Sequence, residues 1–226
     1  MEQIRLNKFL SERLGFSRRE ADDLIAAGKV LVNDKPAILG ARIDKNDKVC
    51  YNNKIVPFGV LFCYLAFNKP VGYVCSRRAQ GDAPTIYEIL PEKYRDLKTV
   101  GRLDKDSSGL ILLTNDGDFA FQMTHPKFYK EKVYEVVLDR ELEPLHQQMI
   151  SDYGVQLEDG VSKLGLAKLS DDNRREWQVT MSEGRNRQIR RTFIALGYHV
   201  VALHRTQFGK YQLSGLKPGE WVEFTK

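Results

Sequence analysis

Residues 101–117 have the sequence Gly101-Arg102-Leu103-Asp104-Lys105-Asp106-Ser107-Ser108-Gly109-Leu110-Ile111-Leu112-Leu113-Thr114-Asn115-Asp116-Gly117. The apolar run from Leu110 to Leu113 lies between a Ser-Ser-Gly turn and an Asn-Asp-Gly turn, which is typical of a buried strand. Asp104 therefore lies on a short loop held by a rigid element, where catalytic side chains are often found. From the residues alone, Asp104 is either a catalytic carboxylate or an aspartate that caps a turn or pairs with Arg102.

Length and composition limit the classes of protein to consider. The 226 residues can form one large domain, or a large and a small one. The formal net charge of +5 allows an anionic partner without requiring one. Three cysteines without a C-x-x-C pair argue against a disulfide framework and a structural zinc site, and suit a reducing compartment. With no apolar signal segment and no run long enough to span a bilayer, we expect a soluble, cytoplasmic protein without a membrane partner.

Several common chemistries lack their motifs. The sequence contains no phosphate-binding G-x-x-x-x-G-K-[ST] loop, no dinucleotide-binding G-x-G-x-x-G and no G-x-S-x-G nucleophile elbow. The four histidines show no metal-ligand spacing shared with a cysteine. We therefore expect Asp104 to act without a cofactor or a metal.

Residues 1–57 have the pattern of a separate small domain. Apolar residues recur at helical spacing at Leu6, Phe9, Leu10 and Leu14. The string Ser17-Arg18-Arg19-Glu20 is a capping-box pattern that starts a second helix, expected to end at Gly28. A strand over Val30–Val32 and a turn at Asn33-Asp34 follow. The basic and acidic residues of the two helices nearly balance, so charge alone does not separate an RNA-binding module from a packing or dimerisation module.

The order of residues in this module resembles the S4 RNA-binding domain. The matching strings are Arg5-Leu6-Asn7-Lys8-x-Leu10 and Ser17-Arg18-Arg19-x-Ala21. In that family two helices present a basic face to structured RNA. The resemblance implies RNA contacts by Arg5, Lys8, Ser17, Arg18 and Arg19.

Residues 58–226 contain three further segments of interest, after an expected linker at Pro57-Phe58-Gly59 and a buried strand over residues 60–67. The first segment, Asn68-Lys69-Pro70-Val71-Gly72, is by itself an ordinary turn. The second, Lys132–Leu138, alternates like a strand, and Tyr134 within it could be a core residue. The third, residues 184–210, has six Lys and Arg and no Asp or Glu, an electrostatic footprint for phosphate or else a solvated helix face.

In this order the segments resemble the motifs of the RsuA-type ribosomal RNA pseudouridine synthases, which isomerise uridine. The resemblance implies that Asp104 is the catalytic carboxylate, that Tyr134 lies under the target base, and that Arg190 pairs with Asp104 and favours its charged form. It also implies RNA contacts by Lys69, Arg102, Arg185, Arg187 and Gln188. We expect Asp106 to cap the turn that follows it, although two carboxylates could also act as a pair.

The resemblance implies an α+β fold. A small S4-like α/β RNA-binding domain (1–57) would precede a pseudouridine synthase catalytic domain (58–226), with a largely antiparallel mixed sheet flanked by helices. A hairpin turn is expected over residues 216–221. The partner would be ribosomal RNA, within a ribosomal subunit assembly intermediate, and the protein a monomer that serves ribosome biogenesis.

Two questions stay open at this point. Strings such as Gly154-Val155-Gln156-Leu157 favour the branch that modifies small-subunit (16S) RNA, whereas Asn186–Arg191 is more like the enzymes of large-subunit (23S) RNA. Two rival functions also remain: a non-catalytic ribosome-associated RNA-binding protein, and an RNA N-glycosylase that would release free uracil.

Overall fold

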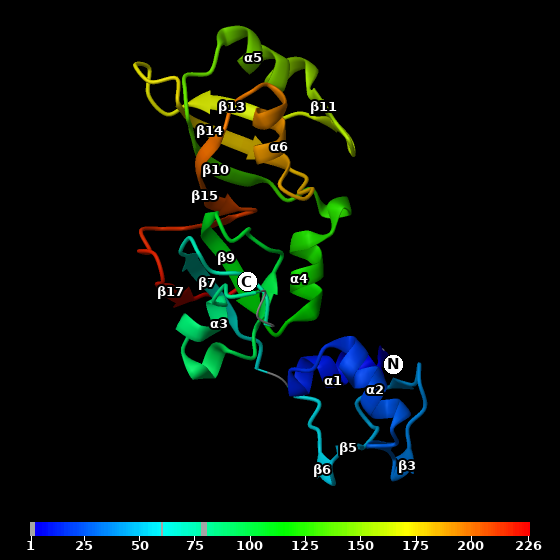
Figure 1. Cartoon of the computed structure of the whole chain (residues 1–226). Coiled ribbons are helices and arrows are strands. Elements are labelled where there is room, and N and C mark those ends of the chain that lie inside the picture. The colour runs from blue at the N-terminus through cyan, green and yellow to red at the C-terminus, as the bar shows by residue number, and fades with distance from the viewer. Residues whose placement is uncertain (1–2, 60, 78–80) are drawn as a thin grey trace. The chain divides into compact units, whose positions relative to one another are not determined.

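The computed structural model describes residues 3–59, 61–77 and 81–226 and forms two compact units (Figure 1). Unit 1 comprises Met1–Cys63 with Asn115–Gly117, and unit 2 comprises Tyr64–Thr114 with Asp118–Lys226. Unit 1 thus extends beyond the boundary expected at residue 57. The reason is that Phe58 packs on Phe9, with ring centroids 4.5 Å apart, and accepts a hydrogen bond from Arg13 at its carbonyl.

The two helices of unit 1 begin where the local sequence predicts. Helix α1 (Leu6–Leu14) ends at Gly15, whose φ of 76° is a left-handed conformation that glycine adopts without strain. Helix α2 (Arg18–Ala26) begins with the predicted capping box: the Ser17 hydroxyl accepts from the Glu20 N–H at 3.1 Å, and the Ser17 N–H donates to the Glu20 carboxylate at 2.7 Å. The helix ends two residues before the expected Gly28.

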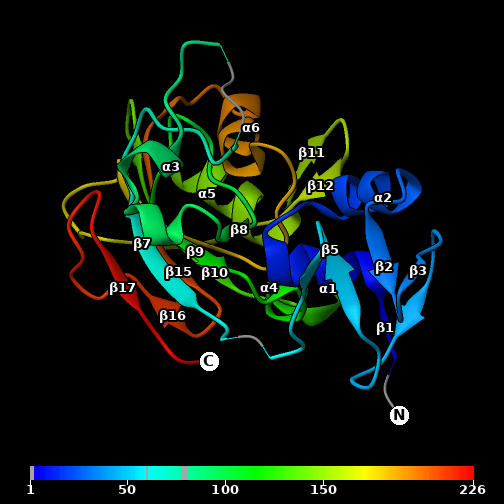
Figure 2. The same ribbon diagram turned by 90° about the horizontal axis from the view of Figure 1, so that it is seen from below.

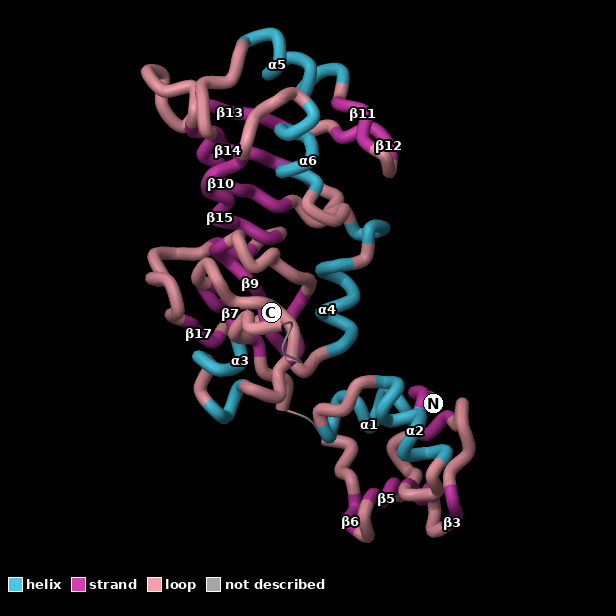
Figure 3. Tube along the Cα trace, viewed as in Figure 1, coloured by secondary structure: helices cyan, strands magenta, loops and turns pink. Residues whose placement is uncertain are grey.

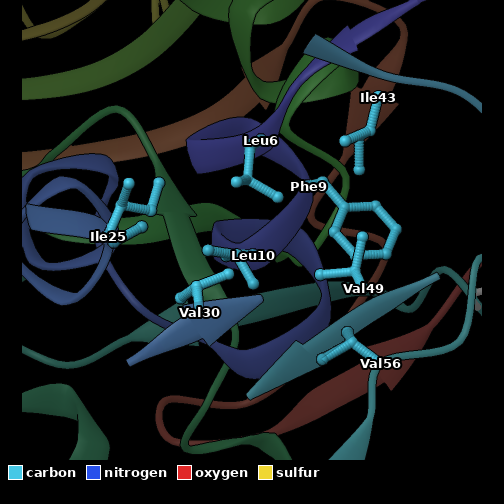
Figure 4. Close-up of a cluster of buried hydrophobic side chains, with 9 residues drawn as sticks. Leu6, Phe9, Leu10, Ile25, Val30, Ile43, Val49 and Val56 are labelled. Atoms are coloured by element: carbon cyan, nitrogen blue, oxygen red, sulfur yellow. The ribbon is translucent and has the colours of Figure 1, made fainter. Parts of the chain in front are cut away.

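Short strands complete unit 1. Strand β1 (Ile4–Arg5) pairs with β4 (Arg42–Ile43), and a second sheet has the order β3-β2-β5-β6. Its strands are β2 (Val30–Val32), β3 (Lys35–Pro36), β5 (Val49–Tyr51) and β6 (Lys54–Ile55). The predicted turn at Asn33 and Asp34 is present, with φ of 51° and 64°. Figure 4 shows the core between helices and strands, made by apolar side chains that include Leu6, Phe9, Leu10, Ile25, Val30, Ile43, Val49 and Val56.

Unit 2 is built on a mixed sheet that, among the described residues, has nine strands. The main path is β13-β14-β10-β15-β9-β7-β17, with β16 paired to β15 and β8 to β9. The strands are β7 (Tyr64–Lys69), β8 (Lys98–Val100), β9 (Ser108–Thr114), β10 (Lys132–Leu138), β13 (Gly165–Lys168), β14 (Glu176–Met181), β15 (Val200–Phe208), β16 (Tyr211–Gln212) and β17 (Trp221–Glu223). In the described part of this sheet, only the β9–β15 pair is parallel, so the largely antiparallel mixed sheet is confirmed. A separate hairpin joins β11 (Val155–Leu157) and β12 (Gly160–Ser162).

The sheet consists of two groups of strands. Figures 1 and 3 show β13-β14-β10-β15 and β9-β7-β17 meeting where β15 passes β9. The parallel pairing at this junction covers only two residues on each strand, His204 with Ser108 and Arg205 with Gly109. The loop that carries Asp104 leads directly into β9, so the junction is the position from which a site can draw residues from both groups.

Helices flank the sheet. They are α3 (Ile86–Ile89), α4 (Gly117–Thr124), α5 (Pro144–Gln148) and α6 (Gln188–Ala195), with the 3₁₀ turns η1 (Glu92–Tyr94) and η2 (Pro126–Phe128) and the π-helical segment η3 (Met149–Tyr153). In Figure 2 α3, α5 and α6 lie on one side of the strands. Phe119 and Met123 of α4 pack with Tyr64 and Leu110 of the sheet. No helix in the described ranges is long and apolar enough to cross a membrane.

Two expectations about strands differ from the structure. The buried strand expected over residues 60–67 is present as β7 but begins only at Tyr64; Leu61 and Phe62 precede it and are exposed, and Val60 lies outside the described residues. Near the end of the chain, the Glu220 N–H does donate to the Lys217 carbonyl in a turn. The strand that follows, β17, pairs with β7 rather than with its neighbour in sequence, so no hairpin forms there.

Candidate active site

Asp104 lies on the loop between β8 and β9, and contacts from a second loop hold this segment in place. The Ser107 N–H donates to the Asp104 carbonyl at 3.1 Å and closes a turn. The Gly72 N–H donates to the Lys105 carbonyl at 2.8 Å. The Asp104 side chain is about one third exposed. The loop is therefore braced by its backbone while its carboxylate remains accessible.

Lys69 provides a further brace from inside the molecule. Its side chain is 0% exposed, and its ammonium group donates to the carbonyls of Ser107 at 2.6 Å and Pro70 at 3.0 Å. Burial lowers the pKa of Lys69, and this outweighs the neighbouring acidic groups, which raise it. The RNA contact expected for Lys69 is therefore corrected: this lysine satisfies buried carbonyls beneath the aspartate loop.

Gly109 allows the two groups of strands to meet. Its φ is +105°, and a β-carbon at this position would lie 2.5 Å from the backbone nitrogen of Arg205. No residue with a side chain can occupy the position without moving β15. The close approach brings Arg205 beside the start of β9, where its Nε donates to the Leu110 carbonyl at 2.7 Å.

The two nearby carboxylates have different partners. Asp106 receives a bidentate pair of hydrogen bonds from Arg187, at 3.0 and 2.9 Å, and lies 3.3 Å from Nε of Arg190. The hydrogen bonds from Arg187 lower the pKa of Asp106, with the charge of Arg190 as a further cause. Asp104 has a longer contact, 3.6 Å from Nη1 of Arg187. Asp106 was expected to cap the turn that follows it. Its carboxylate instead binds Arg187 and Arg190.

Arg190 does not form the ion pair expected with Asp104. Its guanidinium is buried and donates to the carbonyls of Val200 at 2.7 Å and Asp106 at 2.9 Å, and its nearest carboxylate is that of Asp106. These carbonyls fix the guanidinium at the base of the aspartate loop. The structure therefore has Arg187 in contact with both carboxylates, and Arg190 in contact with that of Asp106.

A cavity of about 520 Å³ opens beside Asp104. It lies at the junction of the two strand groups, and the residues that line it include Asp104, Tyr134, Ile189, Leu203, Arg205 and Phe208. Tyr134 and Arg205 are cross-strand neighbours on β10 and β15, and the Arg205 guanidinium lies 6.0 Å from the Tyr134 ring centroid and 4.9 Å from that of Phe208. The cavity thus combines one accessible carboxylate with an aromatic surface and a buried cation.

Two cations of this cavity were not identified from the sequence as site residues. Arg205 is only 2% exposed and lies opposite Gly109 in the β9–β15 pairing. That register is not visible in the sequence, so Arg205 could not be recognised from it. Lys132 lines the cavity and donates to the carbonyl of Glu183 at 3.1 Å. Burial, and secondarily the charge of Arg205, lower the pKa of Lys132 to about 8. Its position two residues before Tyr134 could have indicated it.

Most of the polar residues expected to bind RNA in residues 184–191 have partners inside unit 2. Arg185 donates to the carboxylates of Asp159 and Glu183 and to the backbone of the β11–β12 turn. Gln188 is buried and donates to the Ser162 hydroxyl and to Glu183. Both expectations are therefore corrected, because these side chains hold the segment before α6. Arg102, by contrast, is exposed at the cavity, as is part of Arg187.

Unit 1 presents its expected RNA-binding residues differently. Arg5, Arg18 and Arg19 are exposed. Lys8 is half-buried and lies 3.8 Å from the carboxylate of Glu12, one helical turn away. The Ser17 hydroxyl is engaged in the capping box, so Ser17 shapes the start of α2.

Comparison with known proteins decides the family. The model for RNA pseudouridylate synthases matches residues 63–195, and the S4 domain model matches residues 4–49. The chain belongs to the RNA pseudouridylate synthase family. As a synthase of this family it carries an N-terminal S4 domain, in agreement with both resemblances found in the sequence.

Full-length relatives of the synthase carry more specific names. It is 37% identical to the ribosomal small subunit pseudouridine synthase A of Pasteurella multocida, over 96% of this chain and 94% of the relative. It is 34% identical to the ribosomal large subunit pseudouridine synthase B of Bacillus subtilis, over 98% and 92%. A solved structure described as a pseudouridylate synthase matches with a TM-score of 0.69 and 32% identity, over 98% of this chain and 96% of that one.

Proposed function

We propose that this synthase isomerises one specific uridine of ribosomal RNA, with Asp104 as its catalytic group. The observation that supports this most directly is the cavity, in which Asp104 and Tyr134 face one space of about 520 Å³. That volume lies within the range of sites that enclose a small molecule. A uridine turned out of its stack would fill it, at a cost of a few kcal/mol that is smallest in a loop or strained element.

The reaction balances without an added reagent. The C1′–N1 bond breaks and its electron pair goes to N1, the uracil turns, and C5 bonds to C1′. The proton on C5 is lost and N1 gains one, so the product is an isomer and no oxidant or energy source is consumed. Asp104 would act either by adding to the nucleoside or by removing a proton from the ribose.

The other cavity residues would position the base and the loop. Tyr134, held on β10, would stack on the uracil and keep it in register while it is detached. Arg205 would hold the tyrosine ring from the neighbouring strand, at 6.0 Å from its centroid. Arg187, 3.6 Å from Asp104 and hydrogen-bonded twice to Asp106, would hold the two carboxylates of the loop in place.

We propose small-subunit RNA as the substrate, within an assembling subunit in the cytoplasm, and a monomeric enzyme. The relative from Pasteurella multocida and the string Gly154–Leu157 support the small subunit. The exposed arginines of the S4 domain support a second contact with structured RNA, outside the catalytic unit.

A second candidate substrate is large-subunit RNA. The string Asn186–Arg191 and the Bacillus subtilis relative favour it. The identities to the two kinds of relative, 37% and 34%, are too close for identity alone to choose between them.

Mapping pseudouridine in both ribosomal RNAs, in cells with and without the gene, tests the proposal. Loss of one pseudouridine in small-subunit RNA is the expected result. Loss of a pseudouridine in large-subunit RNA alone would make that RNA the substrate instead. Identical pseudouridine maps with and without the gene would contradict the proposed function. Incubating the purified protein with ribosomal RNA separates the rival chemistries, since an N-glycosylase would release uracil and a binding protein would leave uridine unchanged.

A further inference from the structure

An aromatic surface lies beside the catalytic cavity and has no part in the chemistry described above. Its two packed rings are Phe121, in the last turns of α4, and Phe128, at the end of η2; Tyr129 follows Phe128 directly in the chain. Phe121 is 46% exposed and Tyr129 is 79% exposed. The rings of Phe121 and Phe128 meet edge to face, with centroids 5.8 Å apart. We call Phe121, Phe128 and Tyr129 the aromatic shelf.

The shelf carries positive charge. The ammonium group of Lys127 lies 5.3 Å from the Phe121 centroid and 4.7 Å from the Phe128 centroid. From Phe121 to Lys130 the sequence has two lysines, one histidine and no Asp or Glu. Exposed rings with cations beside them match the flat bases and the phosphates of an unpaired nucleic acid strand.

The shelf is continuous with the cavity. The residues between its rings, Thr124, His125 and Pro126, line the same cavity as Asp104 and Tyr134. Figure 3 shows the short helix η2 directly after α4, before the chain enters β10, the strand of Tyr134. A strand of RNA that leaves the cavity on this side would therefore pass the shelf.

The backbone of the shelf is firmly held. Tyr129 has a φ of 45°, a left-handed conformation that is uncommon for a bulky residue and is often found at functional positions. Its N–H donates to the Pro126 carbonyl at 3.1 Å, and the Lys127 N–H donates to Nδ1 of His125 at 3.3 Å. These bonds hold the backbone beside the exposed Tyr129 ring, so little backbone freedom would be lost when a base binds there.

We propose that the aromatic shelf binds an unpaired nucleotide adjacent to the target uridine by stacking. The inference rests on the proposed function, because it places the target uridine in the cavity. It makes the shelf a specificity-determining subsite: RNA in which the neighbouring base is paired or missing binds less tightly. The base is held by its face, so the shelf selects unpaired structure more than base identity.

The test uses full-length protein and a ribosomal RNA fragment that contains the mapped uridine, with KM and kcat measured separately. In Phe121→Ala/Tyr129→Ala, KM should rise roughly tenfold with kcat nearly unchanged, as expected for the loss of one stacked base. Tyr129→Ala alone should give part of this rise in KM. Because the Tyr129 side chain is so exposed, this single variant should fold even if the double variant does not. Tyr153→Ala, which removes an equally exposed aromatic from η3, is the matched control and should leave KM unchanged.

A second fragment carries abasic nucleotides on either side of the uridine. Wild-type protein should lose the same roughly tenfold on this RNA, and the double variant should lose nothing further. Equal losses of affinity in the double variant and the wild type would contradict nucleotide binding by the shelf. An unchanged KM in the variants would contradict it too. In either case the exposed rings would be left as a docking surface for a protein. Conversion of the intact fragment by the wild type tests the proposed function separately, so each proposal can fail without the other.

Discussion

The arginines of unit 1 and those of residues 185–191 in unit 2 look alike in the sequence and have different environments in the structure. Arg5, Arg18 and Arg19 are exposed on the S4 domain. Arg185 and Arg191 are bound instead to the carboxylate of Asp159, at 3.0 and 2.7 Å. Charge density along a chain therefore does not tell which cations can reach a phosphate.

The difference suggests a division of work. Exposed arginines with little protein contact can exchange water for phosphate and release counterions, so they set affinity and its dependence on salt. Buried or paired arginines lose that ability but hold fixed positions. Arg187 and Arg190 bind groups of the aspartate loop, and Arg185 and Arg191 bind Asp159. We expect substitutions in unit 1 to act on binding and substitutions at the base of the aspartate loop to act on turnover.

Arg190→Ala should have the largest effect among the arginines. Turnover should fall by roughly 10²–10³, because the loop that carries Asp104 loses the guanidinium that fixes its position. The free energy of unfolding should fall by about 1–3 kcal/mol, because the carbonyls of Val200 and Asp106 lose their donor. Single-turnover kinetics and thermal unfolding measure both. Arg191→Ala changes the neighbouring residue on α6 and is the control; its turnover rate should equal that of the wild type. A wild-type rate in Arg190→Ala would contradict the claim that the arginines at the aspartate loop act on turnover.

Tyr134→Ala should come next, with a loss of roughly 10–100-fold in kcat/KM if stacking on the base is its role. Tyr134→Phe keeps the ring and should lose little. Steady-state kinetics on one RNA fragment compares the two, with a melting curve to check that the alanine variant is folded. If both variants lose activity equally, the hydroxyl and not the ring is what the site uses.

Arg18→Ala/Arg19→Ala should weaken RNA binding by roughly tenfold and make its salt dependence shallower by about one to two units in the logarithmic slope. Turnover at saturating RNA should stay the same. Affinity measured over a series of salt concentrations checks this. Arg185→Ala removes one arginine from the other region and should leave the slope unchanged; a shallower slope there would show that paired arginines also reach phosphate.

Lys132 should give the smallest effect, a few-fold change with pH. Its pKa of about 8 means that the ammonium group loses its charge as the pH rises through 8, so the affinity for RNA should fall across about pH 7 to 9. Lys132→Arg stays charged and should show no such fall, and Lys132→Met should be weaker throughout with a flat profile. The same slope in all three proteins would assign the titration to another group.

Local sequence predicted those elements whose cause is local. The capping box at Ser17, the stop at Gly15 and the strand Leu110–Leu113 inside β9 are confirmed, since each depends on residues within a few positions of one another. The α+β class and both family resemblances are also confirmed. The pairing of β17 with β7, about 155 residues apart in the chain, could not be predicted, because the turn before β17 is compatible with several partners.

The site was predicted by resemblance more than by physics. The common cavity of Asp104 and Tyr134 agrees with the motifs. The partner of Arg190 could not be predicted, because Asp104 and Asp106 are two residues apart and the path of the loop decides which carboxylate the arginine reaches. The burial of Lys69 could not be predicted either, because it depends on the loop that packs over it and accepts its hydrogen bond. Arg205 depends on the register of β15 against β9, which is a property of the fold.

The most direct test of the central claim compares the two carboxylates. Pseudouridine formed in a single turnover should be abolished in Asp104→Asn, with RNA affinity and melting temperature close to those of the wild type. Asp106→Asn should still convert uridine, more slowly and with a lower melting temperature, because Arg187 and Arg190 lose their carboxylate partner. Near-normal conversion by Asp104→Asn, or complete loss in Asp106→Asn with a stable fold, would contradict the assignment of Asp104 as the group that carries the chemistry.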